Sequence, residues 1–263
     1  MATVVVFGGG GFLGRRLVDR LSAESVTVRV AVRHPEPARI ALRSLGFDRV
    51  TVVYADVRDQ GSVAAAIAGA DAVVDAVSAY VEKGGVTFEA VHVRGSENVA
   101  REAVAAGVAR LLVSGIGADR YSSSPYIRSR GRGEVMVQQA FPSATIVRPG
   151  AMFGPGDALF ATLAELARLL PVLPLIGGGT RLQPVFVEDV AKAITNILSD
   201  PGTVGQTYEL AGPRVYTLRE LVNMTLQLMG KRRLLVAVPF CRGRDPSKTV
   251  RVPARSTAYH GAG

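Results

Sequence analysis

Three glycines near the amino terminus, Gly8, Gly11 and Gly14, have a spacing that suits contact between backbone and phosphate. They follow an apolar run at residues 4–7 and open a segment with helical spacing of apolar residues. Gly8 permits a tight turn, Gly11 lets the backbone approach a pyrophosphate, and Gly14 lets the helix pack close to the strand. The helix amino terminus then offers free N–H groups and a partial positive charge. The pattern predicts a dinucleotide site, with a plain glycine turn as the alternative.

The residue that ends the second predicted strand, 26–32, bears on which dinucleotide binds. An acid at this place usually bonds the ribose hydroxyls of NAD, but this chain has Arg33 followed by His34. A guanidinium matches a 2′-phosphate in charge and in geometry, and Arg15 or Arg16 could assist it. We therefore predict NADP(H), with NAD(H) as the second choice. The alternative is a surface arginine on a connecting loop.

Asp56 and Val57 follow the third predicted strand, 50–54. In a sheet of this kind the position lies beside the adenine, where a carboxylate can accept a hydrogen bond from the exocyclic amine. An aspartate after a strand also forms turns and caps the next helix. Both interpretations stay open for Asp56.

Tyr126 and Arg130 are the residues best suited to proton chemistry. They are four apart at the start of a predicted helix, so their side chains project from one face. A tyrosine beside a cation can exchange a proton with an alcohol or a carbonyl. The alternative is an ordinary amphipathic helix with a tyrosine near its cap. Because the three histidines are scattered and Cys241 lies near the end, we predict no metal site.

Strands and helices alternate six times over the first 150 residues. We predict strands at 4–7, 26–32, 50–54, 72–77, 110–114 and 144–148, with helices between them, among them one over 88–106. The alternation predicts an α/β protein, a Rossmann-type doubly wound parallel sheet with a small C-terminal α/β lobe. We expect a nucleotide-binding domain at 1–150, a substrate or partner lobe at 151–240 and a disordered basic tail at 241–263.

The 263 residues carry a net charge of +9, which is concentrated at one end. Residues 231–263 hold eight of the 31 lysines and arginines but one of the 22 acids, so the body is nearly neutral and we expect no nucleic acid partner. A basic end favours an anionic membrane surface or an acidic partner, although it can equally be a solvated tail. Residues 231–238 could accordingly meet a lipid interface or form a last core strand. No apolar run is long enough for a membrane span, and we expect a cytoplasmic protein.

The chain as a whole resembles the extended and atypical short-chain dehydrogenase/reductase superfamily. Within it, the chain looks most like the nucleotide-binding accessory subunit of respiratory complex I and its bacterial relatives. The resemblance spans residues 3–240. It rests on the glycine motif, on the tyrosine followed four residues later by a cation, and on short matches at 12–15, 122–128, 140–142, 147–149, 153–154 and 183–190.

The resemblance implies a role for several residues along the nucleotide. The adenosine and phosphate end would be held by Gly8, Gly11, Phe12, Leu13 and Arg33. Ser114, at the end of the fifth strand, would also contact the cofactor. The remaining contacts would flank the ribose (Val77, Ser78), touch the nicotinamide ribose (Tyr126, Arg130) and wall the nicotinamide (Pro149, Gly150, Ala151).

Two departures from the family pattern concern turnover. Active members carry Lys where this chain has Arg130, and a Ser or Thr near the place of Gly115 and Ile116. Losing one group that polarises the substrate oxygen can cost ~10²–10³ in turnover. The resemblance thus implies a cofactor-binding accessory or assembly subunit of complex I, peripheral on the cytoplasmic face of the inner membrane. The alternative is a working NAD(P)-dependent reductase, dehydrogenase or epimerase that uses Tyr126 as acid and base.

Overall fold

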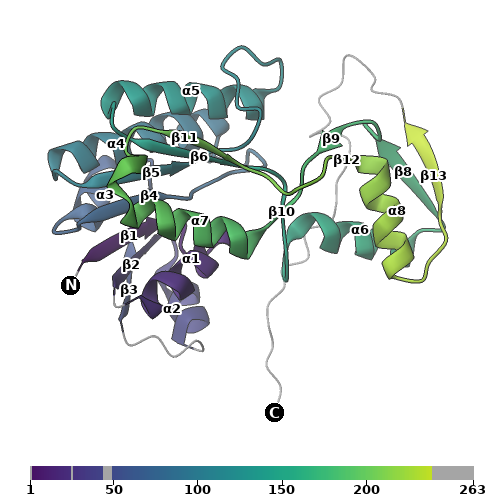
Figure 1. Cartoon of the computed structure of the whole chain (residues 1–263), viewed down its shortest axis with the longest axis horizontal. Coiled ribbons are helices and arrows are strands. Elements are labelled where there is room, and N and C mark those ends of the chain that lie inside the picture. Colours follow the sequence, from purple (N-terminus) through teal and green to yellow (C-terminus); the bar gives the residue numbers. More distant parts are fainter. Residues whose placement is uncertain (1, 25, 44–48, 239–263) are drawn as a thin grey trace.

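The structure, a computed structural model, describes residues 2–24, 26–43 and 49–238 (Figure 1). Seven parallel strands form the main sheet in the order β11-β6-β5-β4-β1-β2-β3. The strand order reverses between β1 and β4, which leaves a crevice outside the carboxyl ends of these strands. The predicted Rossmann-type sheet is confirmed. Its strands are β1 Thr3–Phe7, β2 Thr27–Val32, β3 Val50–Tyr54, β4 Ala72–Asp75, β5 Ala109–Val113, β6 Thr145–Pro149 and β11 Thr207–Leu210.

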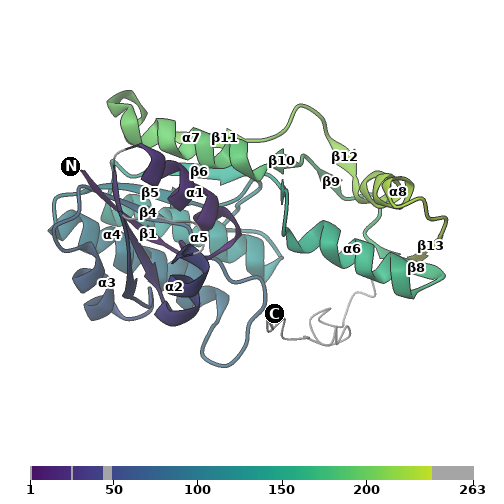
Figure 2. The ribbon, with the colours of Figure 1, turned by 90° about the horizontal axis from the view of Figure 1, so that it is seen from below.

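Helices cover both faces of this sheet (Figures 1 and 2). Alternate residues of β1 point to opposite faces, so Val4 and Val6 enter one core cluster while Val5 and Phe7 enter another. The central strands are apolar on both sides, as a doubly covered parallel sheet requires. One layer holds α1 Phe12–Ala23, α2 Pro35–Arg43 and α7 Val187–Ser199; the other holds α3 Gln60–Ile67, α4 Ser96–Ala105 and α5 Pro125–Ala140.

The chain returns to the main sheet after residue 150. Helix α7 packs against α1, and β11 extends the sheet beside β6. Strand β11 is not among the strands predicted from the sequence, because its burial alternates weakly and its partner strand lies about 60 residues earlier. Parts of the range 151–240 therefore lie in the body of the molecule. The division of the chain at 150 and at 240 stays a prediction.

The helix expected over 88–106 is two helices of different geometry. A wide-turned π-helix spans Glu89–Gly95, and α4 follows it. A Cβ on Gly133 of α5 would lie 2.0 Å from the carbonyl oxygen of His92, so the absence of a side chain there lets α5 approach the π-helix. π-turns of this kind often occur at functional sites. This one places His92 beside α5.

The small lobe stands apart from the main sheet (Figures 1 and 2). Its described residues form two helices and two short two-stranded sheets. Its own core comprises Ala167, Leu173, Leu175, Val222 and Leu226. The elements after β6 are β7 Met152–Phe153, α6 Ala158–Leu169, β8 Val172–Ile176, β9 Arg181–Leu182, β10 Val185–Phe186, the 3₁₀ turn Pro201–Thr203, β12 Tyr216–Thr217, α8 Leu218–Leu228 and β13 Leu234–Val238.

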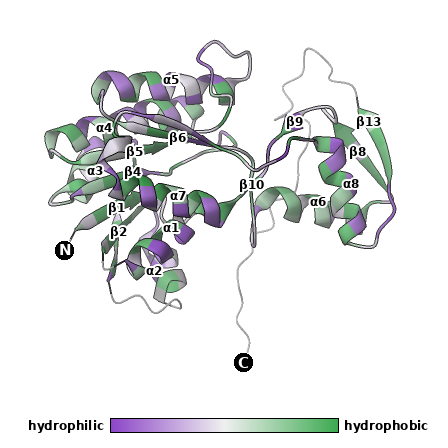
Figure 3. Cartoon of the chain, in the orientation of Figure 1, coloured by the Kyte–Doolittle hydropathy of each residue, from purple (hydrophilic) through white to green (hydrophobic). Residues whose placement is uncertain are grey.

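Strands β8 and β13 are largely apolar (Figure 3). Several of their apolar residues are exposed. In the parallel register Leu234 pairs with Val172, and Val238 pairs with Ile176; all four are exposed, as is Val236. We call these five residues the apolar lobe face. Among the described residues, no helix is long and apolar enough to cross a membrane. The predicted tail at 241–263 lies outside the described residues.

Candidate functional site

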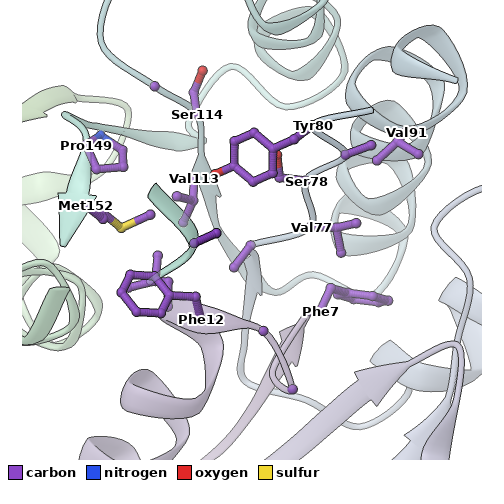
Figure 4. Close-up of a pocket in the computed structure, with 18 of the residues that line it drawn as sticks. Phe7, Phe12, Val77, Ser78, Tyr80, Val91, Val113, Ser114, Pro149 and Met152 are labelled. Carbon is purple, nitrogen blue, oxygen red and sulfur yellow. The ribbon is translucent and has the colours of Figure 1, made fainter. Parts of the chain in front are cut away.

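A pocket of about 1400 Å³ opens at the carboxyl edge of the sheet and runs toward the small lobe. Figure 4 shows side chains from β1, α1, the loop after β4, and the ends of β5 and β6 turned toward it. Except Gly14 and Arg16, every residue proposed from the sequence as a site residue lines this pocket. Gly14 is buried behind it, in the first turn of α1. The topology therefore gathers residues that lie far apart in the sequence.

The loop between β1 and α1 fits the phosphates of a dinucleotide. Gly8 has a φ of 76°, and a Cβ on it would lie 2.9 Å from the carbonyl oxygen of Ala76. A Cβ on Gly14 would lie 2.2 Å from the carbonyl oxygen of Gly8, so only glycine allows α1 to sit this close. Gly11 caps α1 without a side-chain hydrogen bond, and the first turn holds no acid. The partial positive charge of the helix end is thus left for an anion.

The arginines near the predicted adenosine end have different surroundings. Arg33 and Arg15 are exposed and line the pocket. Arg16 is engaged elsewhere: it donates to the carbonyl oxygens of Phe12 and Pro155 and lies 3.3 Å from Glu188. Arg16 does not line the pocket, because its guanidinium ties α1 to Pro155 and to Glu188 of α7. Arg15 lines the pocket and stays the candidate for the second contact with a 2′-phosphate.

Asp56 is held by Arg58 within the same loop. The Arg58 guanidinium donates to both carboxylate oxygens, with Nε 2.9 Å from Oδ1, and the Arg58 backbone N–H donates to Oδ1 as well. These hydrogen bonds from Arg58 hold the pKa of Asp56 below its usual range, against the opposing effect of burial. The N-cap of α3 is Asp59, so Asp56 does not cap that helix. Its contact with adenine stays a prediction, as does that of Val57.

Arg130 is buried, and both of its terminal nitrogens donate to protein groups, whereas its Nε has no partner among the described residues. Nη1 donates to the carbonyl oxygen of Val113 at 3.1 Å, and Nη2 donates to the Ser78 hydroxyl at 2.6 Å. Nη2 also lies 3.5 Å from the Tyr126 hydroxyl. The arginine thus joins the ends of β4 and β5 to α5, and it places a permanent charge at the inner end of the pocket.

Tyr126 is surrounded by aromatic rings whose contact with it could not be predicted from the sequence. His92 and Phe88 meet its ring edge-on, and Tyr80 stacks on it with ring centroids 5.7 Å apart. His92 Nε2 accepts from the backbone N–H of Ala79, and Nδ1 pairs with the Ser129 hydroxyl at 2.9 Å. No spacing in the sequence links His92 to Tyr126, because the π-helix and the small residue at 133 create the contact.

Burial, helped by the charge of Arg130, lowers the pKa of His92 to about 3. In the unfolded chain this pKa is about 6.5. The unfolded state therefore binds the extra proton first, and the protein loses stability as the pH falls from about 6.5 toward 3, by up to ~1.4 kcal/mol per pH unit.

Chemical unfolding at pH 7, 6, 5 and 4 tests this expectation. The variant His92→Gln should lose this part of the pH slope, whereas His34→Gln, at an exposed position, should keep the slope of the wild type. Equal slopes in His92→Gln and the wild type would contradict a neutral, buried His92.

The remaining predicted contacts form the wall at the ends of β5 and β6. Ser114 is 5% exposed, and its hydroxyl has no hydrogen-bond partner among the described residues. Ile116, at the place of the expected polar residue, donates its backbone N–H to the Pro149 carbonyl and offers no hydroxyl. A Cβ on Gly150 would lie 2.3 Å from the carbonyl oxygen of Gln183, so Gly150 lets the wall meet the segment before β10. Ala151 and Val77 also line the pocket.

No cluster of three or more potential metal ligands occurs among the residues that the structure describes. Cys241 and His260 lie outside them.

Comparisons with known proteins agree with this geometry. A family model described as NAD(P)H-binding matches residues 8–201. The mitochondrial NADH dehydrogenase [ubiquinone] 1 alpha subcomplex subunit 9 of Arabidopsis thaliana is 36% identical over 240 residues, which cover 89% of this chain and 60% of that protein. The ceramide reductase of Caulobacter vibrioides is 33% identical over 238 residues, covering 90% and 73% of the two chains. The chain thus spans about 60% of the length of the plant subunit.

A solved structure of dTDP-glucose 4,6-dehydratase from Streptomyces venezuelae with NAD bound superimposes with a TM-score of 0.78 at 24% identity. The match covers 92% of this chain and 86% of the dehydratase. At this identity, the likeness shows the shared fold.

Proposed function

Because the chain belongs to the NAD(P)H-binding family of extended short-chain dehydrogenases/reductases, we propose that it is an NADP(H)-binding accessory or assembly subunit of respiratory complex I. Its turnover is weak or absent. The observation that carries the proposal is the contrast within one pocket: the phosphate loop is open to a ligand, while both terminal nitrogens of Arg130 are directed at oxygens of Val113, Ser78 and Tyr126. The site suits holding a nucleotide better than turning it over.

The preference for NADP(H) rests on Arg33. It directly follows β2 and is an exposed residue that lines the pocket, at a place where an acid would select NAD. Arg15 lines the same end and supplies a second cation. Two guanidinium groups suit the charge of a 2′-phosphate.

The docking part of the proposal rests on the small lobe. The apolar lobe face exposes 65% of Leu234 and 44% of Val236, which is unusual for a strand of this composition. Lys231, Arg232 and Arg233 immediately precede Leu234, the first residue of this face on β13. We propose that this face contacts a complex I subunit, and that the basic residues lie near the anionic surface of the cytoplasmic side of the inner membrane. The plant relative, named as a subunit of the complex, supports the choice of partner.

Co-purification from detergent-solubilised respiratory membranes tests the docking. The tagged chain should migrate with NADH:ubiquinone oxidoreductase activity on native gels, and the double variant Leu234→Glu/Val236→Glu should be released from it. A matched pair on the body, Ile40→Glu/Val104→Glu, replaces exposed apolar residues of the same kind and should stay bound. Release of both pairs alike, or no co-migration of the wild type, would contradict the proposal.

A second candidate is an active NAD(P)-dependent reductase. The observation in its favour is the Tyr126 hydroxyl, which lines the pocket with Arg130 3.5 Å away. Bound NADPH would supply the hydride, and Tyr126 would donate the proton to a carbonyl oxygen. The Caulobacter relative, named a reductase, supports this candidate. Oxidation of NADPH with aldehydes or ketones that is lost in Tyr126→Phe would favour it over the accessory role.

A further inference from the structure

The pocket continues beyond the nucleotide loop, between the body and the small lobe. Its volume of about 1400 Å³ exceeds the roughly 300–1,000 Å³ that usually holds one ligand. The part next to the lobe is lined by Leu159, Thr162 and Leu163 of α6, together with Met152 and Leu182. If the proposed nucleotide occupies the first part, this second part is left for another molecule.

The walls of this second part are mostly aliphatic. Leu159, Thr162 and Leu163 are three and four residues apart, so they share one face of α6. From the body, Val81 and Ile116 line the same pocket and are 69% and 37% exposed. Figure 4 shows Tyr80 and Met152 pointing into the same space. Apolar side chains left exposed inside a pocket mark a surface that an apolar ligand would cover.

Few polar groups of the lobe are free to recognise a hydrophilic ligand here. Asp157 accepts from the backbone N–H groups of Phe160 and Gly154 at the start of α6. The side-chain amide of Gln183 donates to the Gly212 carbonyl. Among the described residues that line the lobe side, Arg181 is the remaining charged group. A sugar nucleotide has two phosphates and several hydroxyls, which would lose their hydration against these walls without gaining partners.

Polar groups gather instead at the inner end, where the two parts of the pocket meet. Ser114 lines the pocket, and its buried hydroxyl has no partner among the described residues. The Tyr126 hydroxyl lies in the same lining. A ligand with one small polar head and an apolar remainder would place the head here and its chain along α6.

We propose that this second part of the pocket binds a molecule with an extended hydrocarbon chain, whose carbonyl or hydroxyl head meets Ser114 and Tyr126. The proposal deepens the proposed function and rests on it only in that the nucleotide fills the first part. Each methylene that enters the apolar walls should raise the affinity up to about fourfold.

The affinity of the pocket for hydrocarbon chains is measured by displacing a fluorescent fatty acid, cis-parinaric acid, from the full chain. The competitors are hexanal, octanal, decanal and dodecanal, with UDP-glucose beside them, each with and without saturating NADPH. We expect the affinity to rise with each added methylene until the chain fills the pocket, and UDP-glucose to displace no probe. Displacement by UDP-glucose, or equal affinity for all four aldehydes, would overturn the proposal.

Two substitutions locate the site. Val81→Glu changes an exposed residue on the body side of the pocket, and Leu159→Glu changes the α6 wall. Each should weaken probe binding at least tenfold, whereas Leu228→Glu, 89% exposed on α8 and outside the pocket lining, should leave it unchanged. Unchanged probe binding in Val81→Glu, which is too exposed to unfold the chain, would overturn the proposal. NADPH binding is measured in parallel. If the chain binds the probe but does not bind NADPH, the result contradicts the proposed function and leaves the hydrocarbon site standing.

Discussion

Replacing Gly11 with alanine should lower the affinity for NADPH about 100-fold, or about 2.8 kcal/mol, with little change in stability. A Cβ on Gly11 would meet only the Gly8 carbonyl oxygen, at 3.1 Å, a tight contact that a shift of a few tenths of an ångström in the loop would relieve. The methyl would instead occupy the space above the start of α1, where a pyrophosphate approaches the backbone. Calorimetric titration gives the affinity, and thermal unfolding without nucleotide gives the stability.

Gly179→Ala is the matched control for this substitution. A Cβ there would meet nothing within 4 Å, and Gly179 does not line the pocket. We expect it to bind NADPH as the wild type does. If Gly11→Ala folds normally and binds NADPH with unchanged affinity, the phosphates do not pass over this loop.

The second large effect is expected from Arg33→Ser, which should lower the affinity for NADPH roughly 10- to 100-fold, because charge-assisted hydrogen bonds to a phosphate are lost. Binding of NADH should change less than about threefold, since NADH has no 2′-phosphate for Arg33 to contact. Titrating both nucleotides into both proteins gives the four dissociation constants.

Arg94→Ser removes the same charge from an exposed position outside the large pocket, and it should not change the ratio of the two affinities. A loss of affinity for NADH as large as that for NADPH would show that Arg33 does not read the 2′-phosphate.

Much of the fold could be predicted because short segments of the sequence determine their own secondary structure. Apolar runs such as residues 4–7 and 26–32 are long enough to mark buried strands, and the glycine spacing marks the first turn. Strand β11 and the pairing of β8 with β13 depend on partners far along the chain. Nothing in their own residues identifies those partners.

The candidate site shows the same limit at the level of side chains. Tyr126 and Arg130 could be found by their spacing, and Arg33 by its place at the end of a strand. The contact of His92 with Tyr126 depends on a π-helix, and the diversion of Arg16 depends on Pro155 and Glu188. The sequence also does not predict that both terminal nitrogens of Arg130 donate to protein oxygens.

The most direct test of the central claim is a calorimetric titration of the nucleotide-free wild-type chain with NADPH and with NADH. We expect one nucleotide per chain and a dissociation constant for NADPH at least about tenfold lower than that for NADH, in line with one charge-assisted contact. Equal affinities, tighter binding of NADH, or no binding of either nucleotide would contradict the account.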